Sequence, residues 1–198
     1  MSVLIAYKRG DTIYMGSDTR VIVDDHKKNE LCECNYKIQK FDNGMLIGIT
    51  SDRLTRQTIF AYPEIFTLDK KGELNRKHII KEIIPKLVEM LNDEDLMITK
   101  EDEMPYMDAQ ILIAYKSELY EICKNFSVYK YDDYQALGSV AEYGQFTLVN
   151  TKETDDINER IVKTLDIIAN NSQLVGSPYL LIDTKELKYK IIRSENIW

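Results

Sequence analysis

Two stretches of the chain repeat apolar residues at the three- and four-residue spacing of an amphipathic helix. Short strand-like runs lie before, between and after them, so the expected order is strands, helices, strands, helices, strands. This order differs from the strict alternation of strand and helix in a doubly wound parallel sheet. It predicts an α+β fold in which two antiparallel sheets pack together with helices outside. The apolar positions are Ile79, Ile80, Ile83, Ile84, Leu87, Val88 and Leu91, then Ile157, Ile161, Val162, Leu165, Ile168 and Ala169.

The strand-like segments are short, and turn residues separate them. We expect strands over 3–8, 12–16, 19–23, 36–41, 45–49, 109–115, 119–123, 126–131, 179–182 and 187–192. The charged segment 24–30 is expected to be a loop, and 140–149 to be helical. Asn75 and Thr154 are suited to cap helix N-termini. Pro85 should kink the first long helix, because it has no backbone N–H to donate.

Length and charge limit the functional class. A chain of 198 residues is within the usual size of one domain, and no linker divides 1–198. Its net charge of −7 makes it a poor binder of nucleic acid or of an anionic membrane. No apolar run approaches the roughly 20 residues that cross a bilayer. The apolar run at the N-terminus is too short for a signal peptide, so we expect a cytoplasmic protein.

The three cysteines, Cys32, Cys34 and Cys123, are an odd number without a secretion signal, which argues against a disulfide framework. Cys32 and Cys34 share one face if they lie on a strand, and they can form half of a metal site. The two histidines, His26 and His78, have no ligand-like spacing to each other. We therefore expect reduced thiols, no metal site and no cofactor.

The first hairpin indicates where chemistry can take place. If the chain turns about Gly10, the numbers of facing residues add up to 20, and Ser2 faces Asp18. Directly opposed residues lie about 4.5–5.5 Å apart. Met1 is commonly removed ahead of a small residue, and its removal gives Ser2 a free α-amine. That amine, with a reference pKa of about 7.7–8.0, can accept the serine proton.

A lysine cation near such an amine lowers the pKa of the amine, and a carboxylate keeps the lysine charged. Lys37, on a following strand, completes the set with Ser2 and Asp18. A plainer interpretation stays open, because serine is among the commonest second residues and lone Asp and Lys residues near strand ends are usually solvated. The sequence contains no Gly-x-Ser-x-Gly elbow and no Walker loop.

These residues resemble the opening of proteasome β-subunits and of the bacterial HslV-type peptidase. The matching segments are 2–8, 15–20, 36–41, 104–112 and 136–143. The resemblance places Ser2 on the N-terminal threonine nucleophile and Asp18 on the family's aspartate. It places Lys37 on the catalytic lysine and Ser139 on the accessory serine. It implies a four-layer αββα sandwich of the N-terminal-nucleophile (Ntn) hydrolase type.

The same resemblance implies peptide-bond hydrolysis through an ester to the N-terminal residue. The implied substrates are peptides or unfolded proteins. The implied partners are further copies of the chain, in a ring or a related self-assembly, and an ATP-dependent unfoldase.

The sequence departs from the family pattern in several places. The nucleophile is serine rather than threonine, and Met1 precedes it. The family's glycine-rich segment falls on 48–52, where the backbone N–H of Ser51 takes the place of the oxyanion donor and the neighbouring Asp52 opposes a developing negative charge. Two other functions therefore stand beside the serine-type peptidase. One is a catalytically inactive assembly or peptide-binding protein on the same fold, and the other is an unrelated two-layer α+β binding domain.

Overall fold

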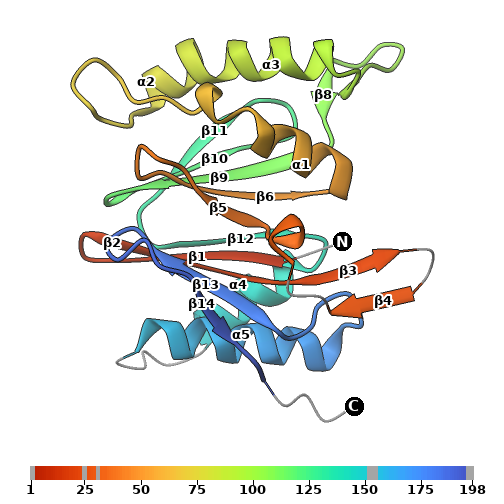
Figure 1. Ribbon diagram of the computed structural model, residues 1–198, viewed down its shortest axis with the longest axis vertical. Coiled ribbons are helices and arrows are strands. Elements are labelled where there is room, and N and C mark those ends of the chain that lie inside the picture. Colours follow the sequence, from red (N-terminus) through yellow and green to blue (C-terminus); the bar gives the residue numbers. More distant parts are fainter. Residues whose placement is uncertain (1–2, 24–25, 30–31, 151–155, 195–198) are drawn as a thin grey trace.

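Two five-stranded antiparallel sheets face each other at the centre of the molecule, and helices cover both outer faces (Figure 1). The computed structural model describes residues 3–23, 26–29, 32–150 and 156–194. Sheet I has the strand order β12 (Tyr134–Gly138), β1 (Val3–Arg9), β2 (Thr12–Asp18), β13 (Tyr179–Asp183) and β14 (Lys190–Ile192). Sheet II has the order β11 (Val128–Tyr131), β10 (Glu118–Ile122), β9 (Ala109–Tyr115), β6 (Leu46–Ser51) and β5 (Ile38–Lys40). The predicted αββα sandwich is confirmed.

The helices form the two outer layers (Figure 1). Sheet II is covered by α1 (Arg53–Ala61) and by a longer helix made of α2 (Arg76–His78), the π-helical segment η3 (Ile79–Ile83) and α3 (Ile84–Asp93). Sheet I is covered by α4 (Ala141–Asn150) and α5 (Ile157–Asn171). The smaller elements are β3 (Arg20–Val23) paired with β4 (His26–Asn29), β7 (Met97–Ile98) paired with β8 (Tyr106–Met107), and two 3-10 turns, Glu33–Asn35 and Pro63–Ile65.

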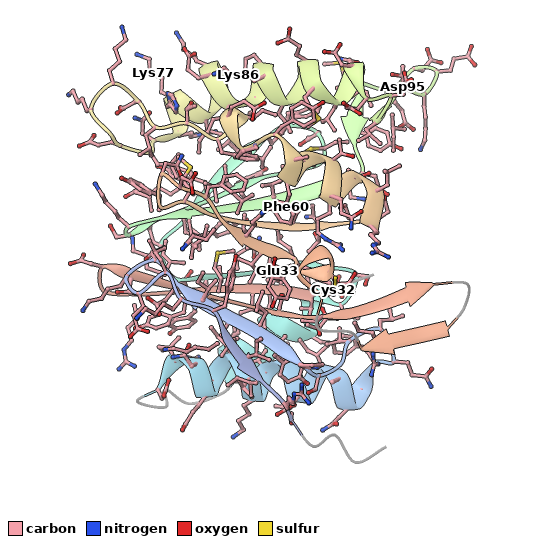
Figure 2. The ribbon with its side chains drawn as sticks, viewed as in Figure 1. Cys32, Glu33, Phe60, Lys77, Lys86 and Asp95 are labelled. Carbon is pink, nitrogen blue, oxygen red and sulfur yellow. The ribbon has the colours of Figure 1, made fainter. Side chains whose placement is uncertain are left out.

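The longer helix over sheet II begins as predicted and is disturbed at its proline. The Asn75 side chain caps it by accepting a hydrogen bond from the backbone N–H of His78 at 3.0 Å. Pro85 has no N–H to give to the carbonyl of Lys81, and Lys81 lies in the π-helical segment. Lys77 and Lys86 extend into solvent from the outer side of this helix (Figure 2).

Three apolar layers separate the four structural layers. The layer between the two sheets contains Leu4, Ala6, Ile13, Met15, Ile38, Leu46, Leu112, Ala114, Leu119, Leu137, Leu180 and Ile182. The two outer layers join each sheet to its helices. The sheets approach closely at Gly48, where an added Cβ would lie 2.5 Å from a methyl carbon of Leu4 and 2.7 Å from the Met15 methyl carbon. A larger residue there would have to displace the ends of the Leu4 and Met15 side chains.

The register of the first hairpin differs by one residue from the prediction. Arg9 pairs with Thr12 and Leu4 pairs with Ser17, so the numbers of facing residues add up to 21 and not 20. The turn contains two residues, Gly10 with φ of +58° and Asp11, and therefore has no single central residue. Continued to its end, this register sets Val3, and not Ser2, opposite Asp18.

Several local expectations are corrected. The segment 24–30 contains strand β4, which pairs with β3 in a hairpin beside sheet I (Figure 1). Helix α1 and strand β12 were not expected from the sequence. Thr154 lies outside the described residues, and Asp156 is the N-cap of α5, accepting a hydrogen bond from the N–H of Asn158 at 2.8 Å.

The cysteines also differ from expectation. Cys32 is disulfide-bonded, whereas Cys123 is a free thiol, so the expectation of reduced thiols is wrong for Cys32. The described residues contain no group of three or more His, Cys, Asp or Glu side chains placed to hold a metal ion. Among the described helices, none has the length and apolar character needed to cross a membrane.

Candidate active site

Four segments from both sheets meet at the start of β1. Val3 pairs with Gly138 at the end of β12, and Ser139 lies in the turn that follows. Asp18 is the last residue of β2, and Lys37 directly precedes β5 of sheet II. The structure therefore brings Asp18 and Lys37 together and sets the Ser139 turn beside the start of β1. Ser2, the predicted nucleophile, lies outside the described residues.

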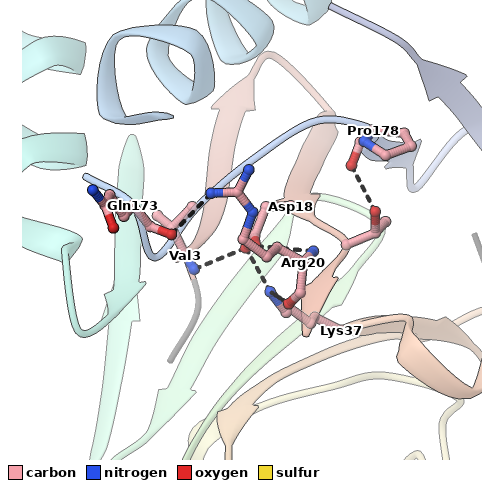
Figure 3. A network of polar contacts seen from close by, with 7 residues as sticks. Val3, Asp18, Arg20, Lys37, Gln173 and Pro178 are labelled. Atoms are coloured by element: carbon pink, nitrogen blue, oxygen red, sulfur yellow. Dashed lines mark hydrogen bonds and ion pairs between the residues drawn. The ribbon is translucent and has the colours of Figure 1, made fainter. Parts of the chain in front are cut away.

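The Asp18 carboxylate is the centre of this site (Figure 3). Its Oδ1 accepts a hydrogen bond from the backbone N–H of Val3 at 3.1 Å and an ion-paired one from Lys37 Nζ at 2.6 Å. Its Oδ2 accepts from the backbone N–H of Arg20 at 3.2 Å. Lys37 Nζ also donates to the backbone carbonyl of Arg20 at 3.3 Å. These contacts hold both charged groups in one geometry.

This ion pair is removed from water. The Asp18 side chain is 0% exposed and the Lys37 side chain 2%. Burial lowers the pKa of Lys37 below its ordinary value of 10.5, because desolvation disfavours the cation. Asp18 acts in the opposite direction and favours the charged form, whereas the nearby Arg56 and Arg20 cations add to the lowering. The site thus concentrates positive charge around a single carboxylate.

Arg20 joins the site to the end of helix α5. Its Nη1 donates to the carbonyl of Gln173 at 2.8 Å (Figure 3). An added Cβ on Gly176 would lie 2.2 Å from Arg20 Nη2, so only glycine lets the guanidinium cross the backbone there. The neighbouring Thr19 donates its hydroxyl to the carbonyl of Pro178 at 2.8 Å. No role was predicted for Arg20 from the sequence. The feature that could have pointed to it is its charge, two positions after the candidate residue Asp18.

A cleft of about 480 Å³ contains two further predicted site residues, Ser51 and Ser139. Its full lining is Thr50, Ser51, Asp52, Asp108, Gln110, Lys124, Gly138 and Ser139. Lys124 Nζ lies 2.5 Å from an oxygen of Asp108 in an exposed ion pair. The cleft is therefore polar, and it opens where the Ser139 turn passes the end of β6.

Asp52 forms one wall of the cleft and also caps helix α1. Its carboxylate accepts hydrogen bonds from the backbone N–H of Thr55 at 3.0 Å and from the Thr55 hydroxyl at 2.5 Å. Partial burial acts to raise the pKa of Asp52, but the hydrogen bonds from Thr55 outweigh it and bring the pKa below its ordinary value. Asp52 is thus ionised at neutral pH, beside the predicted oxyanion donor Ser51.

No protein-family model matches the sequence, and no curated protein sequence matches it. Solved structures do match. BPH from Thiobacillus denitrificans superposes with a TM-score of 0.72 at 17% identity, over 94% of this chain and 98% of that one. Anbu from Hyphomicrobium sp. strain MC1 gives 0.71 at 12% identity, over 98% and 89%. HslV from Trypanosoma brucei gives 0.59 at 14% identity, over 91% and 98%.

The chain has the proteasome-like fold of the Ntn hydrolases. BPH has also been solved in complex with epoxomicin, and Anbu from Pseudomonas aeruginosa is described as a helical assembly. At 12–17% identity these similarities establish the fold of this chain, and the assignment of chemistry rests on its own residues.

Proposed function

We propose that the protein is a peptidase that hydrolyses peptide bonds by acyl transfer to Ser2, after Met1 has been removed. One observation carries the proposal: Asp18 Oδ1 lies 3.1 Å from the backbone nitrogen of Val3 and 2.6 Å from Lys37 Nζ. Ser2 directly precedes Val3, and consecutive Cα atoms are about 3.8 Å apart across a trans peptide bond. On this ground the proposal assigns the α-amine of Ser2 to the neighbourhood of the buried Lys37 cation.

In the proposed reaction, the α-amine of Ser2 takes the proton from its own hydroxyl, and Oγ attacks the substrate carbonyl carbon. The negative charge that develops on the carbonyl oxygen is met by the backbone N–H of Ser51. The C–N bond then breaks as the amine returns its proton to the leaving nitrogen, which leaves an ester on Oγ. Water, deprotonated by the same amine, attacks the ester carbonyl carbon; the C–Oγ bond breaks, Oγ takes the proton back from the amine, and the acid product leaves with the serine hydroxyl restored. Ser139 assists the proton transfers.

Lys37 and Asp18 act on the base rather than on the substrate. A cation close to the α-amine disfavours a second positive charge, so more of the amine is in its free-base form at neutral pH. Asp18 keeps Lys37 positioned and counters the desolvation that would remove its proton. The roles of Ser2, Asp18, Lys37, Ser51 and Ser139 are part of the proposal.

Covalent labelling tests the proposal directly. The protein is incubated with epoxomicin, and its intact mass is measured before and after. We expect a mass lower by one methionine and a single adduct of one inhibitor. The Ser2→Ala variant should take no adduct, whereas the control variant Ser117→Ala, in the turn between β9 and β10, should react like the wild type. Retention of Met1 without an adduct would instead favour the catalytically inactive assembly protein.

Self-assembly is the second part of the proposal. Phe146 and Val149 are 70% and 63% exposed, and their three-residue spacing sets them on one outer face of α4. Contiguous exposed apolar patches mark interaction surfaces, whereas single exposed apolar residues do not. We expect Phe146→Glu to shift wild-type oligomers toward smaller species in sedimentation velocity. The control Tyr129→Glu, on β11, should leave the distribution unchanged. An unfoldase partner and a cytoplasmic location stay predictions.

A further inference from the structure

A buried carboxylate, Glu121, organises a second polar network next to the Ser139 turn. Glu121 is 3% exposed and accepts hydrogen bonds at both oxygens. Its Oε1 receives the side-chain amide of Gln110 at 3.2 Å and the Cys123 thiol at 3.3 Å. Its Oε2 receives the Tyr131 hydroxyl and the side-chain amide of Gln135, each at 2.7 Å. All four partners act as donors, so the carboxylate determines how each of them is turned.

This donor requirement fixes the orientation of three glutamines. Gln110 and Gln135 turn their NH₂ groups toward Glu121, so their amide oxygens point away from it. The oxygen of Gln135 then accepts the NH₂ group of Gln145 at 2.9 Å, which also donates to the Ala136 carbonyl at 3.5 Å. The NH₂ group of Gln145 is thereby used, as is that of Gln110. Among the described residues, neither the amide oxygen of Gln110 nor that of Gln145 accepts a hydrogen bond.

The two oxygens belong to residues that line one small cavity, here called the amide pocket. Its volume is about 290 Å³, and Gln110, Gln135 and Gln145 contribute to its wall. Glu142 and Tyr143 also line it, and no lysine or arginine among the described residues does. A carboxylate and an aromatic ring both attract cations. The pocket therefore offers acceptors and negative charge, and it carries no opposing cation.

The amide pocket adjoins the cleft of the candidate active site. It shares Gln110, Gly138 and Ser139 with the cleft that contains Ser51. A ligand extended through that cleft would thus pass the mouth of the amide pocket.

We propose that the amide pocket binds the guanidinium group of an arginine side chain, and that this arginine belongs to the peptide substrate. The second half of the proposal, the peptide substrate, rests on the proposed function. A guanidinium has five N–H donors in a planar fork and accepts nothing, which matches a pocket lined by two glutamines whose amide oxygens accept no hydrogen bond from the described residues. An acidic side chain has no N–H or O–H to donate to these oxygens, and its negative charge would face that of Glu142. A lysine side chain has the right charge but brings only three donors on a point-like head.

Binding of a short ligand separates this inference from the peptidase chemistry. N-acetyl-arginine amide is titrated against the full-length protein, and its dissociation constant is measured by saturation-transfer NMR. The matched ligand is N-acetyl-citrulline amide, which has nearly the same shape and no charge. We expect the citrulline ligand to bind at least about tenfold more weakly, since hydrogen bonds with a charged partner are about twice as strong as neutral ones. The Ser2→Ala variant should bind the arginine ligand like the wild type.

Variants locate the binding. Gln145→Lys puts a cation into the pocket and should abolish binding, whereas Gln57→Lys makes the same charge change on the exposed side of α1 and should preserve it. Glu142→Gln, at an exposed position in the first turn of α4, should weaken binding severalfold. Equal binding of the two ligands, loss of binding in both lysine variants alike, or no saturable binding of the arginine ligand would each overturn the proposal. Because none of these readouts needs Ser2, a failed epoxomicin reaction leaves them interpretable.

Discussion

Replacing Asp18 with asparagine would test the physical basis of the candidate site. The side chain keeps its size and loses its charge, so Lys37 stays buried without an anion. An asparagine also has only one oxygen, whereas Asp18 accepts from Val3 and Lys37 at Oδ1 and from Arg20 at Oδ2. Whichever way the amide is turned, its NH₂ group faces at least one of these donors.

The expected cost is large for a single substitution. Removing one partner of a buried ion pair destabilises a protein by about 3–5 kcal/mol. With a urea m-value of about 3 kcal/mol per M for a chain of this size, the unfolding midpoint should fall by about 1–1.7 M. The double variant Asp18→Asn/Lys37→Met removes both charges, and we expect it to be less destabilised than the two single changes added together.

The pH dependence supplies an independent check. The pKa of Lys37 is already lower in the folded protein than its ordinary value of 10.5, and loss of the Asp18 charge lowers it further. Between the folded pKa and 10.5 the unfolded chain binds more protons, so stability rises with pH in that range. The loss in free energy of unfolding caused by Asp18→Asn should therefore shrink as the pH becomes alkaline.

Urea unfolding followed by circular dichroism, at one protein concentration and at several pH values, measures these quantities. A midpoint within about 0.3 M of the wild type would refute the reasoning, since the linear dependence on denaturant makes a 3 kcal/mol loss visible. A deficit that grows with pH would refute the assigned direction of the Lys37 pKa.

Three further changes have defined outcomes. Asp52→Ala should lower the thermal midpoint at pH 7, because it removes the N-cap of α1. The pKa of Asp52 in the folded protein lies below 3.8, so the difference in thermal midpoint between the variant and the wild type should narrow as the pH falls through that folded pKa. Gly16→Ala should destabilise the protein by about 1–3 kcal/mol in urea unfolding, as overpacked cores do, since its Cβ would lie 2.4 Å from Ile161 Cγ2. Asn75→Ala should cost about 1 kcal/mol by the same measurement, whereas Asn75→Asp should retain most of the cap. A wild-type midpoint in any alanine variant at neutral pH would contradict the contact assigned to it.

Much of the layer order followed from the sequence. Most of the apolar stripe at 79–91 lies on the buried side of η3 and α3, although Ile80 is exposed, and the stripe at 157–169 faces the core from α5. Both patterns are periodic along neighbouring residues, so they are set by local geometry. Helix α1 gave a weaker pattern, because a short helix whose start carries two arginines and a threonine has few apolar positions to repeat.

The candidate site was predictable in its residue types and not in its register. The hairpin prediction set Ser2 opposite Asp18, and this pairing is wrong, because a two-residue turn moves the register by one position and brings Val3 opposite Asp18. The sequence did not predict the network around Glu121. Its members belong to separate elements and share no regular spacing: Gln110, Glu121, Gln135 and Gln145.

The amino-acid sequence by itself determined the two long helices and most of the strands, since their apolar patterns depend on residues a few positions apart; it did not reveal α1, β4 or β12. Tertiary structure alone decided that Lys37, from the edge of one sheet, lies 2.6 Å from Asp18 of the other. That distance depends on how closely the sheets approach and on how many residues each turn contains. Both result from packing the whole chain, because a shift of one residue in one turn changes every partner beyond it.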